Sequence, residues 1–291
     1  MLDTPLFPPA DNMLHCSVNC YRRCREAGLR LAHGGDFWIV KFSAPDWSHD
    51  AKQGGAVIVL HGTGPAFGLP QASPFAMKVE VLLKLSGLPY ALVQADMRGA
   101  PRGKIPWIVD EGRVISDSRL IQAYLETNYT IDFTNDYSGR ALAYGLAIER
   151  MLEDHLYPIL IEQRWASVED LSLDTSQGFD RAPAMQRLWL QIRAGWRARR
   201  LIGLLGLDRL TSAEKYALVC KALDALETAI TGQLYMLGGR VCGVDATAYA
   251  FLAALAAPQF RSSYGAYLRK QVELSAYLAR MQAEFYPDFA G

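Results

Sequence analysis

Two segments of this sequence decide its fold: SPFAMKVEVLLKLSG at residues 73–87 and GKIPWIVDEGRVISDSRLIQAYLE at residues 103–126. The first predicts a helix, because Ser73 is a favourable N-cap, Pro74 suits the first helical position and Gly87 suits the helix end. Few of its positions are polar, which predicts that other elements cover this helix on most sides. The second segment predicts a β-hairpin followed by another helix.

Short apolar runs around these segments predict the strands of a sheet. The run AVIVL, residues 56–60, is rich in β-branched residues and predicts a buried strand. A second strand is predicted over residues 88–96, and the hairpin joins PWIVD to RVI by a turn at Glu111-Gly112. With helices over residues 73–87 and 116–129, the order is strand, helix, strand, strand, strand, helix. This order predicts a small α/β sandwich.

From Ser138 onward the sequence predicts only helices, and Thr211 and Glu214 form a capping box at the start of one of them. The predicted helices are Gly139–Trp165, Pro183–Leu205, Ala213–Thr231, Asp245–Ala257 and Leu274–Phe285. We therefore expect an irregular N-terminal extension over residues 1–55, an α/β domain over 56–133 and an all-helical domain over 134–291. Residues 130–138 form the polar linker between the two domains.

The composition limits the partners and the compartment. Of 291 residues, 30 are Lys or Arg and 30 are Asp or Glu, so the net charge of zero gives no electrostatic reason to expect a nucleic-acid partner. The longest uncharged apolar segment, Ala246–Ala257, is about half the roughly 20 residues that a transmembrane helix needs. We therefore expect no membrane partner. Five scattered cysteines do not suit a disulfide framework and favour a reducing compartment, hence a cytoplasmic location.

Several motifs suggest other functions, and each lacks a required feature. Cys16, Cys20 and Cys24 recur at every fourth residue, but their spacing matches no standard metal motif, so we expect no metal. The glycines of VIVLHGTGPAFG, residues 57–68, follow a strand as in a dinucleotide fingerprint, but the helix begins too late to meet a pyrophosphate. The same segment resembles the oxyanion strand of α/β-hydrolases, but the chain has no G-x-S-x-G motif. His155, a lone histidine on a predicted helix, is interpreted as structural.

The quoted segments resemble a known family. Residues 73–90 and 103–126 resemble the N-terminal thioredoxin-like domain of glutathione S-transferases. RMLEDHLYPILIEQRW, residues 150–165, and CGVDATAYAFLAAL, residues 242–255, resemble the bacterial branch near the metaxin and failed-axon-connections proteins. The resemblance covers residues 56–289. It implies the glutathione S-transferase fold, a thioredoxin-like domain followed by an all-helical domain.

The resemblance also implies a glutathione site. Ser73 stands where Ser- and Cys-type transferases contact the glutathione sulfur, and it is the predicted catalytic residue. Pro106 stands at the family's cis-proline, and the backbone of Ile105 before it is expected to pair with the cysteinyl part of glutathione. Asp117 and Ser118 stand where the family binds the γ-glutamyl end. Asp245 matches an aspartate that acts in folding rather than in catalysis.

The residues themselves give partial support to this site. Ser116, Asp117 and Ser118 open a helix, where free N–H groups attract a carboxylate and Asp117 suits an ammonium group. We expect Lys104 and Arg102 to reach a second carboxylate. The same serines, and Ser73, are also ordinary helix caps, so a purely structural role stays open.

The resulting hypothesis is a glutathione transferase that takes glutathione as co-substrate and transfers its thiolate to a small apolar electrophile. Trp107 and residues 139–165 are expected to line the electrophile pocket, and the resemblance favours a homodimer. The alternative is a non-catalytic interaction module of the metaxin or failed-axon-connections kind, with a degenerate glutathione site. Ala76 stands where the branch often has cysteine, which argues against two-thiol redox chemistry. Cys242 stands where transferases prefer Ser or Thr as a cap, which questions the stability of that helix.

Overall fold

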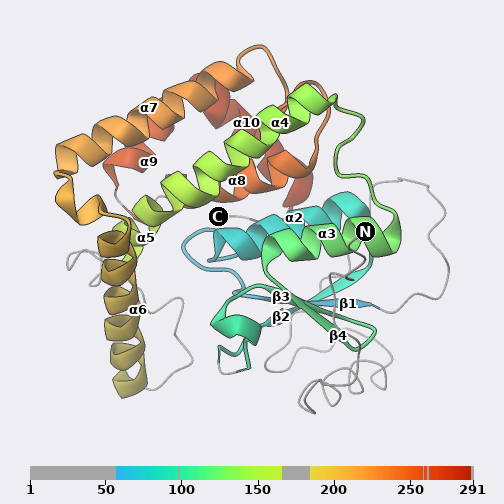
Figure 1. Ribbon diagram of the computed structural model, residues 1–291, viewed down its shortest axis with the longest axis horizontal. Helices are drawn as coiled ribbons and strands as arrows, with labels where there is room; N and C mark the ends of the chain where they lie inside the picture. The colour runs from blue at the N-terminus through green and yellow to red at the C-terminus, as the bar shows by residue number, and fades with distance from the viewer. Residues whose placement is uncertain (1–56, 98, 166–183, 258, 261, 290–291) are drawn as a thin grey trace, which may run out of the picture.

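A four-stranded mixed sheet organises the N-terminal half of the computed structural model, which describes residues 57–97, 99–165, 184–257, 259–260 and 262–289. The expectations for Cys16, Cys20 and Cys24, and for the 1–55 extension, concern residues outside these ranges. The strand order is β2-β1-β3-β4, with β1 parallel to β2 and antiparallel to β3, and β3 antiparallel to β4 (Figure 1). The strands are β1 (Ile58–Gly62), β2 (Tyr90–Gln94), β3 (Trp107–Asp110) and β4 (Arg113–Ser116). The predicted hairpin is confirmed.

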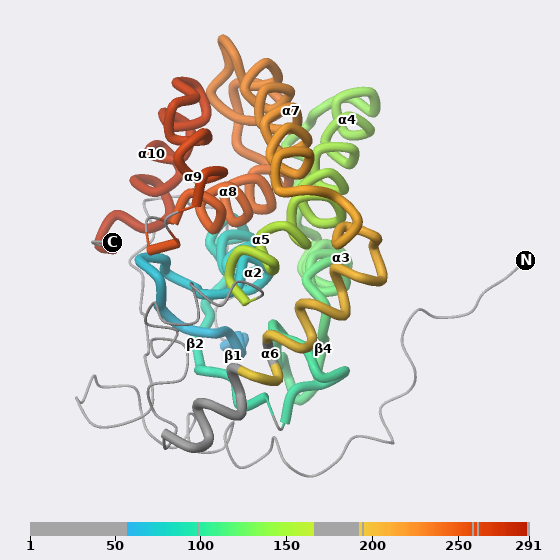
Figure 2. The backbone as a smooth tube through the Cα atoms, turned by 90° about the vertical axis from the view of Figure 1, so that its left-hand side faces the viewer, coloured from blue at the N-terminus to red at the C-terminus, as the bar shows by residue number. Residues whose placement is uncertain are grey.

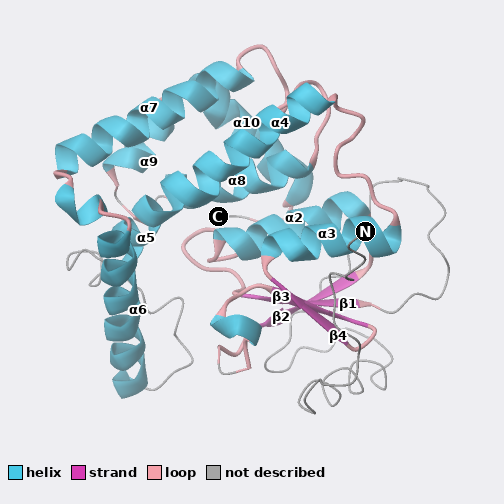
Figure 3. Ribbon diagram, viewed as in Figure 1, coloured by secondary structure: helices cyan, strands magenta, loops and turns pink. Residues whose placement is uncertain are grey.

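Two helices, α2 (Pro74–Ser86) and α3 (Ser118–Tyr129), cover one face of this sheet (Figure 3). The predicted boundaries of α2 are confirmed: Ser73 is its N-cap, and Gly87 ends it with a φ of 67°. Because strand side chains alternate between faces, Ile108 packs in the main core and its neighbours Trp107 and Val109 form a separate small cluster. The sheet therefore has one apolar face under the helices and a second apolar face opposite.

The C-terminal half of the described chain is helical, as expected, and most of it lies over α2 and α3, whereas α6 runs down beside the sheet (Figure 2). Helix α8 is uncharged apart from Asp245, is buried along almost its whole length and packs against α2. The α-helices of this half are α4 (Gly139–Arg150), α5 (Tyr157–Trp165), α6 (Ala184–Leu204), α7 (Ser212–Ile230), α8 (Gly243–Ala256), α9 (Ser263–Leu268) and α10 (Val272–Phe285). The chain also contains two 3₁₀ turns, η2 (Pro101–Gly103) and η6 (Leu207–Arg209).

Two details of the helical half differ from the sequence prediction. The predicted helix Gly139–Trp165 contains a π-helical segment, η3 (Met151–Leu156), between α4 and α5. A single π-helical turn barely disturbs the spacing of apolar residues, so the sequence pattern could not distinguish it from a continuous α-helix. The short helix α9 was not predicted, because six residues are too few to establish a helical period.

Asp245 caps α8 and ties it to the preceding loop. One oxygen of its carboxylate accepts from the backbone N–H of Met236 at 2.9 Å, and the other accepts from the N–H of Cys242 at 2.9 Å. The hydroxyl of Tyr277 on α10 adds a contact of 3.2 Å. The carboxylate thus organises the start of α8, as the resemblance implies, and it offsets the poor capping ability of cysteine at position 242.

A buried ionic cluster joins the two halves, and we call it the Lys78 cluster. The ammonium of Lys78 on α2, which is 1% exposed, lies 2.8 Å from Oε1 of Glu153 and 3.1 Å from Oε1 of Glu149. Arg150 pairs with the second oxygen of Glu153 at 2.6 Å, and the hydroxyl of Thr247 donates to Glu149. The positive charge of Lys78 on α2 is therefore compensated by carboxylates of the α4–η3 segment across the interface.

Candidate functional site

Two predicted site residues, Pro106 and Asp117, meet at one end of the sheet. The last complete ladder row consists of His61, Trp107 and Ser116. The next positions on these strands are Gly62, Pro106 and Asp117, so they form a row across β1, β3 and β4, with neighbouring strands about 5 Å apart. The Ile105–Pro106 peptide bond is cis, as predicted. The topology thus places Pro106 between the end of β1 and the start of α3.

Ser73 lies at this same end of the sheet. Its backbone N–H donates to the hydroxyl oxygen of Thr63, the residue after Gly62, at 3.0 Å. Its own hydroxyl oxygen accepts from the N–H of Ala76 at 3.4 Å, which is the N-cap contact. Among the described residues, the Ser73 hydroxyl donates no hydrogen bond. The side chain is half-buried, so the hydroxyl can cap α2 and still donate to a ligand.

The loop that leads to Ser73 is held by Gln71, which sequence reasoning missed. This side chain is fully buried, and its carbonyl oxygen accepts from the N–H groups of Thr63 at 3.0 Å and Gly64 at 2.9 Å. Its amide nitrogen donates to Glu80 on α2 at 2.8 Å. Because these loop N–H groups are already bonded and α2 begins only at Pro74, the loop is not a dinucleotide-binding turn.

A second loop contact comes from Arg164 near the end of α5. Its guanidinium donates to the carbonyl of Ala72 at 2.5 Å and to the carbonyl of Ala254 at 3.3 Å. The rings of Phe67 and Phe260 lie 5.5 and 4.9 Å from the guanidinium carbon. Burial lowers the pKa of Arg164 to about 10, so it stays charged at neutral pH. The helical half therefore fixes the residue directly before Ser73.

Asp117 has an unusual backbone conformation, with φ 85° and ψ 125°. Such a conformation is costly for a residue other than glycine and is concentrated at functional sites. Its carboxylate accepts from the backbone N–H of Arg119 at 3.0 Å and from the guanidinium of Arg119 at 3.4 Å. Partial burial acts to raise the pKa of Asp117, but the hydrogen bonds from Arg119 and the charges of Arg119 and Lys104 outweigh it and lower the pKa. The carboxylate is therefore ionised.

The remaining predicted site residues lie around this row. Lys104 is exposed and close enough to influence Asp117, Ile105 is half-buried, and Ser118 is 3% exposed in the first turn of α3. Arg102 is exposed and has a φ of 56°. The fold thus gathers all six predicted residues, Ser73, Lys104, Ile105, Pro106, Asp117 and Ser118, at one end of the sheet.

The expectation for Trp107 is wrong. Its ring stacks on His61 with a centroid distance of 4.6 Å, on the sheet face opposite to α2 and α3. It therefore cannot line a cleft against the helical half. Of the predicted segment 139–165, Tyr157 does approach the site region, since its ring meets Phe75 at 4.9 Å. His155 is exposed on η3 and not part of the packed core.

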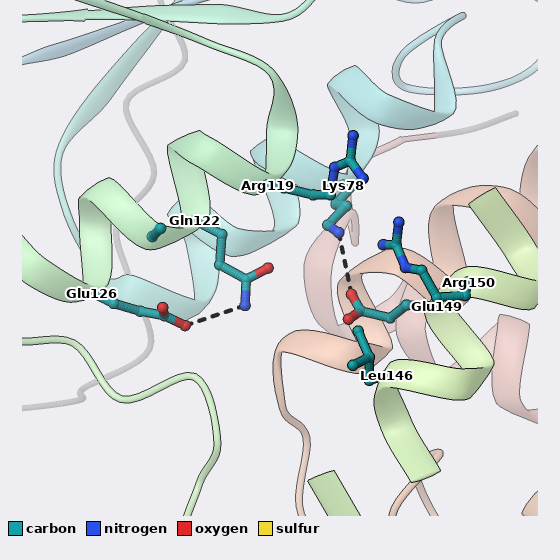
Figure 4. Close-up of a pocket in the computed structure, with 8 residues that line it drawn as sticks. Lys78, Arg119, Gln122, Glu126, Leu146, Glu149 and Arg150 are labelled. Carbon is teal, nitrogen blue, oxygen red and sulfur yellow. Dashed lines mark hydrogen bonds and ion pairs between the residues drawn. The ribbon is translucent and has the colours of Figure 1, made fainter. Parts of the chain in front are cut away.

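A pocket of about 430 Å³ opens between α3 and α4 (Figure 4). Arg119, the partner of Asp117, and Lys78 of the Lys78 cluster both line it, so Arg119 is shared between the pocket and the Asp117 carboxylate. Its lining residues are Lys78, Arg119, Gln122, Ala123, Glu126, Leu146, Glu149 and Arg150. Both charges are present, which suits a polar rather than an apolar occupant.

The described part of the chain contains no group of three or more His, Cys, Asp or Glu side chains able to hold a metal ion. No helix among the same residues has the length and apolar character required to cross a bilayer.

The sheet, the cis-proline before β3 and the helical layer define the class of this protein: a thioredoxin-like domain joined to an all-helical domain. The family model for the glutathione S-transferase N-terminal domain matches residues 74–171, and the model for the glutathione S-transferase C-terminal domain matches residues 219–281. The isoprene-epoxide–glutathione S-transferase of Rhodococcus sp. (strain AD45) is 31% identical over 243 residues, which cover 79% of this chain and 99% of that protein. The chain belongs to the glutathione S-transferase family.

One further similarity supports the fold, and another covers only part of the chain. The beta-etherase LigF of Sphingobium sp. strain SYK-6 is 19% identical over 78% of this chain and 95% of its own, with a TM-score of 0.53. Failed axon connections of Drosophila melanogaster is 34% identical, but over only 33% of this chain and 23% of that protein. The superfamily is therefore established, and a glutathione S-transferase-like function is supported; the metaxin-like branch is not confirmed.

Proposed function

We propose that this protein binds glutathione where Ser73, Pro106 and Asp117 converge at one end of the sheet and transfers its thiolate to a small apolar electrophile. The observation that carries the proposal is the convergence of these residues at one end of the sheet. The ionised Asp117 suits the ammonium of the γ-glutamyl end, and the first turn of α3 suits its carboxylate. The backbone of Ile105, before the cis-proline, would pair with the cysteinyl part, and Lys104 would meet the second carboxylate.

Ser73 would stabilise the thiolate of bound glutathione. A free thiol has a pKa of about 8.5, so little of it is ionised at neutral pH. Lowering this pKa by about two units requires about 2.7 kcal/mol. A hydrogen bond to a charged group supplies about 1.5–3 kcal/mol, and a helix N-terminus adds roughly 0.3–2 kcal/mol. The hydroxyl at the start of α2 offers both contributions.

For an epoxide, the substrate in the name of the Rhodococcus relative, the step would be a substitution. The sulfur forms a bond to one ring carbon, the bond from that carbon to oxygen breaks, and the resulting alkoxide takes a proton from water. A small apolar electrophile of this kind is the proposed substrate class. Two described cysteines, Cys220 and Cys242, are free thiols, which supports a reducing, cytoplasmic compartment. A homodimer is proposed from the family resemblance.

Exchange of Ser73 for alanine tests the proposal. In Ser73→Ala, conjugation should fall at least tenfold, and glutathione affinity measured by calorimetry should change little. The thiolate absorbance of bound glutathione should titrate at higher pH than in the wild type. Ser86→Ala, a serine at the other end of α2, is the matched control and should leave both readouts unchanged. Unaltered turnover in Ser73→Ala would remove Ser73 from the mechanism, and absence of glutathione binding to the wild type would favour the interaction module.

A further inference from the structure

Helix α6 carries large apolar side chains that face solvent. Ile192 is 62% exposed, Trp196 is 58% exposed and Leu204 is 75% exposed. Ile192 and Trp196 lie one turn apart on the same side of the helix, and Leu204 lies about 120° further around the axis than Ile192. Leu205, just after the helix, is 52% exposed and adds apolar surface at the end of α6, on a different side. These four exposed side chains are defined as the α6 stripe: Ile192, Trp196, Leu204 and Leu205.

The α6 stripe stays exposed to solvent because the other side of α6 packs against the fold. Small residues there allow α6 to pack closely against α5, and a Cβ at Gly195 would lie 3.0 Å from the carbonyl oxygen of Trp165. Ala198 and Ile202 are buried on the same side. The helix therefore already has its packing face, and the α6 stripe is additional apolar surface on the outer side.

Positive charge accompanies the stripe. The sequence of α6, AMQRLWLQIRAGWRARRLIGL, contains five arginines and no acidic residue. Arg197, Arg199 and Arg200 are exposed, and within the described ranges none of them forms an ion pair. The guanidinium of Arg200 lies 5.5 Å from the ring centroid of Trp196. By helical geometry, Arg199 and Arg200 lie on the two sides of the line that joins Ile192 and Trp196.

This combination has a known physical use. Helices that lie in the plane of a membrane surface present tryptophan and aliphatic side chains with arginines beside them, which extend to the lipid phosphates. Each basic residue near an anionic surface contributes about 1 kcal/mol, a roughly fivefold gain in binding. In Figure 1, α6 runs down one side of the molecule, from the helical layer past the level of the sheet. Its outer side is thus at the periphery of the fold.

We propose that the α6 stripe and its arginines bind the surface of a bilayer that contains anionic phospholipid. Charge complementarity selects this occupant. A second copy of the chain, docked symmetrically through the same helix, would bring two sets of arginines together without acidic partners on α6. The sequence-based expectation of no membrane partner rested on the lack of a segment long enough to span a bilayer. That feature does not measure the local charge and apolar surface of one helix.

Vesicle sedimentation tests the proposal with the full-length protein. At low ionic strength the protein should sediment with vesicles of phosphatidylcholine and phosphatidylglycerol, but not with phosphatidylcholine alone, and salt should release it. The triple variant R197Q/R199Q/R200Q should bind about a hundredfold more weakly. The variant I192A/W196A should also lose binding, and the wild-type tryptophan emission should shift to shorter wavelength on vesicle addition.

Matched controls use equally exposed positions elsewhere. Val272→Ala, at a side chain that is 74% exposed, and Arg140→Gln on α4 should bind vesicles as the wild type does. Circular dichroism checks that every variant is folded. Absence of vesicle binding would overturn the proposal, as would binding by the triple variant equal to that of the wild type. Conversion of a wild-type dimer to monomer by I192A/W196A, without any vesicle binding, would assign the stripe to a second copy instead.

Discussion

Removal of the buried ammonium at the domain interface is the most direct test of how the two halves are joined. Lys78→Met keeps the length of the side chain but leaves Glu149 and Glu153 without their shared partner. Glu153 would retain Arg150, and Glu149 would retain the hydroxyl of Thr247. Breaking a buried ion pair in this way typically costs about 3–5 kcal/mol, because a desolvated charge loses its compensation.

The expected loss can be measured as a melting temperature. For a domain of 150–250 residues, each kcal/mol lowers the melting temperature by about 2–4 °C, so Lys78→Met should melt about 10 °C below the wild type. Urea unfolding followed by circular dichroism gives the free energy of unfolding directly. Lys270→Met, at an exposed lysine, is the control and should lie within about 0.5 kcal/mol of the wild type.

A second variant separates lost charge compensation from lost packing. In K78M/E149Q/E153Q no carboxylate is left unpaired, so most of the stability should return. The reasoning would be refuted if Lys78→Met unfolded within 1 kcal/mol of the wild type. It would equally be refuted if the triple variant were no more stable than the single one.

Three further predictions follow from other buried polar groups. Burial lowers the pKa of His61 from 6.5 to about 4, so its contribution to stability is present above pH 6.5 and is lost as the pH falls toward 4. His61→Phe should therefore remove about 1–2 kcal/mol of acid sensitivity in urea unfolding, after allowance for partial exposure. Asp245→Ala leaves two buried N–H groups unpaired and should cost about 2–4 kcal/mol in the same assay. Arg164→Met should lower conjugation severalfold, measured as kcat, because the carbonyl before Ser73 loses its donor.

Each of these has a matched control. His155→Phe, at an exposed histidine, should leave the acid sensitivity in place, and Asp288→Asn should leave the free energy of unfolding unchanged. Persistence of the full pH dependence in His61→Phe would contradict the assignment to His61, and a loss below 0.5 kcal/mol in Asp245→Ala would contradict the capping role. Arg164→Lys keeps a donor and should recover part of the activity; equal activity of the methionine variant and the wild type would contradict the role of Arg164.

The parts of the fold that local chemistry determines could be predicted from the sequence. The cap at Ser73, the turn at Glu111-Gly112 and the box at Thr211 and Glu214 depend on neighbours within a few residues, and all are present. Family resemblance supplied the candidate site residues, and the sheet register explains why Pro106 and Asp117 lie side by side. The expectation that Trp107 lines the electrophile pocket was wrong, because it ignored the alternation of side chains between the two faces of β3.

Other features depend on partners far along the chain. Arg164 bonds to a carbonyl 92 residues away, and Lys78 pairs with carboxylates 71 and 75 residues away, so no local pattern marks them. The positive φ of Asp117 depends on how β4 passes into α3. The sequence does not reveal it, because aspartate is also common at N-caps with ordinary backbone angles. These features require tertiary structure.

The two anchors of the loop before Ser73 belong to different halves of the molecule. Gln71 joins the loop to Glu80 of α2, and Arg164 joins it to the helical layer. A small sliding of the helical layer against the sheet would therefore drag the backbone at Ala72 and change where the Ser73 hydroxyl points. The rate of the proposed glutathione transfer should then respond to crowding agents, pressure or distant interface substitutions well before any unfolding is detectable, so this rate would report how tightly the two halves pack.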